Sequence, residues 1–114
     1  MIVSANEKVH IITRRLFDED LRRHFAGVVL EVAEGTIRAI GYAFIYDQAT
    51  GGFVRRKNKR IRVFSLNDAG LIISVLPASA ELDDLHYLID EKGQRILTDD
   101  REFEMNVSEF GASL

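Results

Sequence analysis

The sequence contains no cysteine, which excludes disulfides, thiolate zinc sites, iron-sulfur ligation and cysteine nucleophiles. It contains one proline, Pro77, and eight glycines, so it is neither collagen-like nor of low complexity. No run approaches the roughly 20 consecutive apolar residues that a membrane-spanning helix needs. The first residues also lack the basic start and apolar middle of a secretory signal. We therefore expect a cytoplasmic protein that is not inserted in a membrane.

The composition is typical of a globular domain. Apolar residues make up 46% of the chain and charged residues 29%, which is enough apolar material to bury a core. Because 114 residues leave little room for two independent cores, we expect a single domain over residues 1–114. The connection 77–84, which begins at Pro77, is the expected seam between the main β-barrel and a C-terminal β unit.

Charge is unevenly distributed along the chain. Residues 1–62 hold 12 Lys/Arg and 7 Asp/Glu, whereas residues 63–114 hold 3 and 11. Six basic residues fall within the eight positions 55–62 and form a candidate polyanion-binding set: Arg55, Arg56, Lys57, Lys59, Arg60 and Arg62. Such a run is typical of a solvated hairpin tip, or of a contact for phosphate or for an acidic protein surface. A third interpretation is that the acidic second half neutralises it, within one chain or across a subunit boundary.

The hydrophobic pattern predicts a mainly β protein with one short helix. Alternating or β-branched segments predict strands at 8–14, 28–32, 36–46, 61–66, 71–76, 85–90, 94–98 and 103–107, with 71–76 as the most buried. In residues 17–25, Phe17, Leu21 and Phe25 recur every four positions, which predicts a short N-terminal helix capped by Asp18. The expected architecture is a small barrel or a strongly curved antiparallel sheet whose open end this helix covers.

One predicted strand carries three aromatic residues on one face, Tyr42, Phe44 and Tyr46. The segment Gly41–Ile45 resembles the aromatic strand of RNA-recognition motifs, in which exposed rings stack on bases. The sequence departs from that motif at Ile40, where the motif has Lys or Arg, and at Asp47, where it has an aromatic residue. Two interpretations follow: an aromatic surface for nucleic acid, or a strand whose rings fill a core.

No pattern predicts a catalytic, metal or cofactor site. The three histidines, His10, His24 and His86, lack the spacing of metal ligands. The adjacent carboxylates Asp83-Asp84 and Asp99-Asp100 point to opposite sides of an extended chain, so neither pair forms a catalytic dyad. There is no phosphate-binding glycine loop and no nucleophile elbow. We expect neither a cofactor nor an enzyme, and catalysis by residues distant in sequence is kept as the third functional hypothesis.

Two broader resemblances add expectations. The order of elements over residues 16–77, a short helix, then strands with a long bent second one, then a tight turn between the last two, is similar to that of Sm-like barrels. Those barrels assemble into rings and bind RNA, although the Sm sequence motifs are not part of this similarity. The whole chain, through segments such as Arg22–Phe25, Gly41–Asp47 and Asn106–Gly111, resembles a group of small uncharacterised bacterial proteins. That resemblance implies no activity.

The leading functional hypothesis is a non-catalytic binding or assembly module that forms a homo-oligomer. It follows from uneven charge combined with many short strands whose edges need covering. The alternative is binding of RNA or single-stranded DNA through the run 55–62, against which the net charge of −3 weighs.

Overall fold

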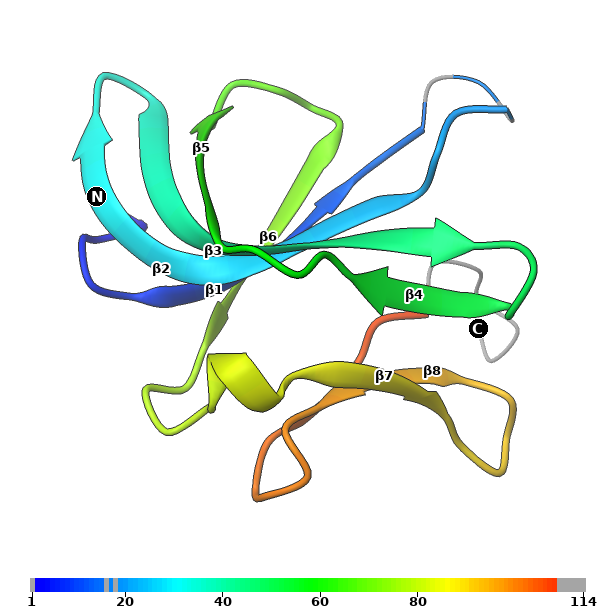
Figure 1. Cartoon of the computed structure of the whole chain (residues 1–114). Helices are drawn as coiled ribbons and strands as arrows, with labels where there is room; N and C mark the ends of the chain where they lie inside the picture. Colours follow the sequence, from blue (N-terminus) through cyan, green and yellow to red (C-terminus); the bar gives the residue numbers. More distant parts are fainter. Residues whose placement is uncertain (1, 16, 18, 109–114) are drawn as a thin grey trace. The chain divides into compact units, whose positions relative to one another are not determined.

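The computed structural model describes residues 2–15, 17 and 19–108. It divides into an N-terminal unit, Met1–Ala78, and a C-terminal unit, Ser79–Leu114. Both units are built from antiparallel β-sheets (Figure 1), which confirms the mainly β prediction. Within the described residues, no helix has the length and apolar character needed to span a bilayer.

The N-terminal unit is one curved sheet of six strands. They are β1 (Lys8–Thr13), β2 (Arg23–Ala33), β3 (Thr36–Asp47), β4 (Gly52–Arg55), β5 (Arg60–Ser65) and β6 (Leu71–Leu76). Their order is β4-β3-β2-β1-β6, and β5 also pairs with β3. In the described part of the chain β5 and β6 do not pair with each other, so the sheet does not close. Of the two expected architectures, the closed barrel is therefore wrong.

The β2–β3 hairpin has strongly curved strands (Figure 1). Its turn has positive φ at both central residues, Glu34 at 50° and Gly35 at 76°, as a two-residue hairpin turn requires. Further along, Gly27 faces Gly41 across the two strands. A Cβ on Gly41 would lie 2.0 Å from the carbonyl oxygen of Ala26, so only glycine permits the backbones to approach this closely.

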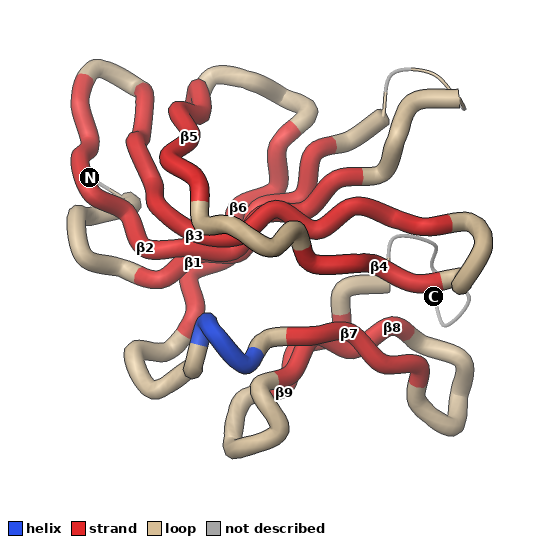
Figure 2. The backbone as a smooth tube through the Cα atoms, viewed as in Figure 1, coloured by secondary structure: helices blue, strands red, loops and turns tan. Residues whose placement is uncertain are grey.

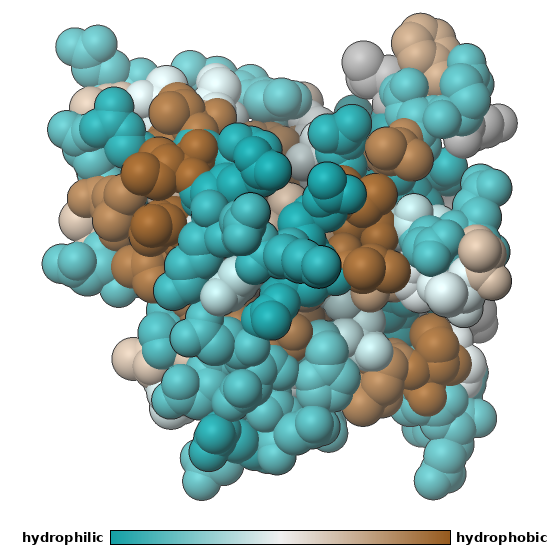
Figure 3. All heavy atoms as spheres, viewed as in Figure 1, coloured by the Kyte–Doolittle hydropathy of each residue, from teal (hydrophilic) through white to brown (hydrophobic). Residues whose placement is uncertain are grey.

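A hydrophobic core cluster of the N-terminal unit lies on one face of the sheet. The buried side chains that form it are Val3, Val9, Ile11, Phe25, Val29, Ile37 and Ala39. Phe64 of β5 packs against this cluster, and its register partner is Ile37 of β3. Because side chains alternate along a strand, Ile61 and Val63 point to the other face, where they are 55% and 62% exposed. Figure 3 shows apolar side chains at the surface beside β5.

The predicted helix at 17–25 is wrong. Arg23, His24 and Phe25 begin β2, and the described residues before them form turns and a loop (Figure 2). Phe17 and Leu21 are 64% and 54% exposed. A helix of under three turns is marginal by itself, whereas β2 gains hydrogen bonds to β1 on one side and to β3 on the other. Asp18, the expected cap, lies outside the described residues.

The prediction that 71–76 is the most buried strand is also wrong. This segment is β6, an edge strand that pairs only with β1 among the described strands. Ile72 is 59% exposed and Val75 is 48% exposed. A continuous apolar run is buried along its length only when other layers cover both faces of the strand, whereas the exposed Ile72 and Val75 lie on opposite faces of β6.

The C-terminal unit is a three-stranded antiparallel meander with one short helical turn. Its elements are η1 (Leu82–Asp84), β7 (His86–Ile89), β8 (Arg95–Thr98) and β9 (Glu104–Asn106), in the sheet order β7-β8-β9. These bounds agree with the strands expected at 85–90, 94–98 and 103–107. The buried Asp99 carboxylate accepts backbone N–H bonds from Glu81, Arg101 and Phe103, and these bonds hold the pKa of Asp99 below its ordinary value.

Candidate functional site: an arginine groove

Strand alternation places two arginines of β5 on the core face of the sheet. Phe64 points toward the core, so Arg62 and Arg60, two and four residues before it, share its face. Near Arg60 the apolar core ends, and both guanidinium groups reach an open hollow. Because Phe64 packs against the core, the side chains of Arg60 and Arg62 point to the same face of the sheet.

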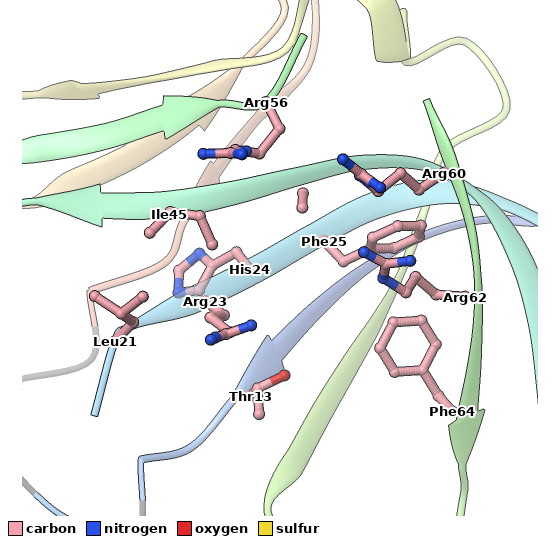
Figure 4. Close-up of a pocket in the computed structure, with 11 residues that line it drawn as sticks. Thr13, Leu21, Arg23, His24, Phe25, Ile45, Arg56, Arg60, Arg62 and Phe64 are labelled. Atoms are coloured by element: carbon pink, nitrogen blue, oxygen red, sulfur yellow. The ribbon is translucent and has the colours of Figure 1, made fainter. Parts of the chain in front are cut away.

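Two further arginines reach the same hollow from other parts of the chain. Arg23 lies on β2, two residues before the core residue Phe25, and Arg56 follows the end of β4. Figure 4 shows the four arginines around one space. We call this space, lined by Arg23, Arg56, Arg60 and Arg62 together with apolar residues, the arginine groove. Its volume is about 530 Å³.

The floor of the groove is apolar. Leu21, Phe25, Ile45 and Phe64 contribute to its lining. The rings of Phe25 and Phe64 lie 5.3 Å apart between centroids, in a tilted arrangement, so the floor continues the hydrophobic core. A site with several cations beside an apolar surface suits a ligand that combines negative charge with a planar or apolar part.

The groove has a strong local excess of positive charge. None of the described residues that line it is acidic. All four arginines are exposed. Guanidinium groups stay protonated and recognise phosphate or carboxylate oxygens through paired N–H donors. The groove therefore has the chemistry of an anion site, although the whole chain carries a net charge of −3.

The predicted basic set is divided between two faces of the sheet. Three of its members, Arg56, Arg60 and Arg62, line the groove. Arg55 and Lys59 lie instead over the ring of Tyr42, at 4.3 and 5.7 Å from its centroid. Lys57 is exposed in the link between β4 and β5.

The predicted aromatic set does not form one exposed surface. Phe44 is only 1% exposed, so it is a buried residue and offers no ring to a ligand. Tyr46 is half-buried and packs edge-on against Phe53, with the Arg22 guanidinium 4.6 Å from its ring centroid. Tyr42 is half-buried beneath its two cations. All three rings lie on the face opposite Ala43 and Ile45, which line the groove.

Two of the three histidines lie together, although the sequence separates them by 14 positions. The rings of His10 and His24 are both buried and meet edge-on at 5.1 Å, and His24 also stacks on Phe53. Burial, with a smaller contribution from the charge of His24, lowers the pKa of His10 to about 3. The His10 ring is therefore uncharged at neutral pH. The His24 ring packs against His10 and Phe53 and is also among the residues that line the arginine groove.

Several acidic residues of the second half have partners within the C-terminal unit. Asp84 pairs with Arg101 at 3.1 Å, and Asp100 lies 3.3 Å from the His86 ring. Within the described residues, no three His, Asp or Glu side chains gather in a way that could hold a metal ion.

Sequence reasoning missed Arg23 as a site residue. The helix predicted at 17–25 would place Arg23 in its last turn, where the helix dipole already accounts for a basic residue. The available signal was its spacing of two from Phe25, which places both side chains on one face if the segment is a strand. The floor residues gave no separate signal, because apolar residues of a groove and of a core look alike in sequence.

The comparisons with other proteins add no relative to this picture. The resemblances to Sm-like barrels and to small bacterial proteins stay predictions from the sequence, because no matched protein tests them. Neither a protein-family model, nor a curated protein, nor a solved structure matches the chain.

Proposed function

We propose that this protein is a non-catalytic binding module that holds single-stranded nucleic acid in the arginine groove. The observation that carries the proposal is the convergence of four guanidinium groups from β2, β5 and the β4–β5 link on one hollow. Backbone phosphates are anions at regular spacing, and arginine binds their oxygens with two donors at once.

The apolar floor favours a single strand over a duplex. A base of a single strand can leave its stack and lie on an apolar or aromatic surface, whereas a duplex keeps its bases paired. Phe25 is only 5% exposed, so the apolar lining that a base can reach is formed by the half-buried Phe64 and Ile45 and the exposed Leu21.

The test is a titration of labelled oligonucleotides of about 12 residues, as single-stranded RNA, single-stranded DNA and duplex DNA, followed by fluorescence anisotropy. We expect binding of the single strands at about 50 mM salt and weaker binding of the duplex. Absence of binding at this salt concentration, where phosphate contacts are strongest, refutes the proposal. Tighter binding of the duplex refutes the role of the apolar floor.

A second candidate function is self-association. It is favoured by the exposed Ile61 and Val63 on β5, a strand whose outer edge is unpaired within the described residues. Light scattering should then give a molar mass above that of one chain, and Val63→Thr should lower it. A monomer at every concentration and salt level rules this candidate out.

A further inference from the structure

β3 changes its partner strand halfway along one edge. Thr36–Gly41 pairs with β5, and Phe44–Asp47 pairs with β4. The link of residues 56–59 therefore leaves the sheet beside Tyr42 and Ala43. The backbone N–H of Arg56 donates to the carbonyl oxygen of Ala43 at 2.8 Å, which holds the start of the link against this edge.

Basic side chains occupy both sides of this edge. Arg56, the first residue of the link, and Arg60, the residue after it, line the arginine groove. Arg55 and Lys59 lie over Tyr42, whose side chain points to the opposite face because it precedes the groove residue Ala43. We call Tyr42, Arg55 and Lys59 the Tyr42 cluster. The groove and the cluster are thus separated only by the edge of β3 and the link that covers it.

We propose that a strand bound in the arginine groove continues around this edge and ends on the Tyr42 cluster. This inference rests on the proposed function, since it extends the path of the same ligand. The Tyr42 ring keeps two cations at its surface, where they can bind the next phosphates. A guanidinium held near an aromatic ring is also a planar surface on which a base can stack. The exposed Lys57 lies in the link along this path.

The path predicts that the contribution of Tyr42 depends on ligand length. An oligonucleotide of about 4 residues should fill the groove alone, and one of about 12 should reach both sites. Tyr42→Leu should weaken binding of the longer strand by roughly tenfold and leave the shorter one unchanged. Tyr42→Phe retains a ring beneath the two cations and should bind as the wild type does.

A second pair of variants tests the path by charge. Arg55→Ala combined with Lys59→Ala should reduce the slope of log affinity against log salt by about 1.4 for the longer strand, at about 0.7 for each lost phosphate contact. For the shorter strand the slope should not change. These two side chains are exposed, so this variant decides the question even if Tyr42→Leu fails to fold.

The outcomes separate the inference from the proposed function. If the wild type binds both lengths and the Tyr42-cluster variants bind the longer strand unchanged, the path is wrong and groove binding stands. If the cluster variants weaken both lengths equally, the cluster is part of the groove's own site and the path is again wrong. If the wild type binds neither length, the proposed function fails, and the inference fails with it.

Discussion

Replacing Arg60 and Arg62 together by alanine removes half of the positive charge of the arginine groove. Both side chains are exposed and come from one strand, whose core contact, Phe64, is unchanged. The variant should therefore fold normally and lose two phosphate contacts. Thermal unfolding measured beside the wild type checks that the fold is retained.

The expected effect follows from counterion release. Four arginines line the groove, and each phosphate contact of a single strand contributes about −0.7 to the slope of log affinity against log salt. The wild-type groove should give a slope of about −2.8 and the double variant about −1.4. Between about 50 and 200 mM salt, the wild type should lose about 50-fold in affinity and the variant about 7-fold.

An oligonucleotide of about 4 residues with a 5′-phosphate has one phosphate for each of the four arginines and restricts this assay to the groove. Anisotropy at four or more salt concentrations gives each slope. The matched control is Arg38→Ala on β3, because Arg38 is exposed, does not line the groove, and pairs with Glu31 at 2.6 Å. Its slope should equal that of the wild type. A double variant with the wild-type slope, or a control that loses as much as the double variant, refutes the assignment of the groove.

Three further predictions concern stability. Gly41→Ala should destabilise the fold by about 1–3 kcal/mol or more in urea unfolding, because the added Cβ would lie 2.0 Å from the carbonyl oxygen of Ala26. Gly52→Ala is the control and should be close to neutral, because nothing lies within 4 Å of its added Cβ. Equal losses of stability in the two variants contradict this prediction. Between pH 6.5 and about 3, His10 binds a proton in the unfolded chain but not in the folded one, so the stability of the fold should fall as the pH falls. The fall should be steeper than in His10→Gln by up to about 1.4 kcal/mol per pH unit. Parallel pH profiles of stability in the two proteins contradict this prediction. Asp99→Ala should lower the midpoint temperature of thermal unfolding, because three backbone N–H groups lose their acceptor. An unchanged midpoint would show that these three hydrogen bonds do not stabilise the fold.

Local signals in the sequence were sufficient for most strands and turns. Alternation predicted strands at 28–32 and 36–46, which lie within β2 and β3. Glu34 and Gly35 join them, and a glycine accepts the positive φ that such a turn needs. The helix at 17–25 failed where a local pattern competed with long-range pairing. Phe25 fits both a helical spacing and a strand, and hydrogen bonds to β1 and β3 favour the strand.

The sequence by itself determined that basic residues cluster at 55–62, but not where each one points. The direction of Arg60 and Arg62 depends on which face of β5 packs on the core, and Phe64 settles this only when it meets Ile37 of β3. Arg23 joins them from a strand more than 30 positions away in sequence. Tertiary structure alone decided the groove and the burial of Phe44, because strand pairing over long sequence distances determines which faces become interior.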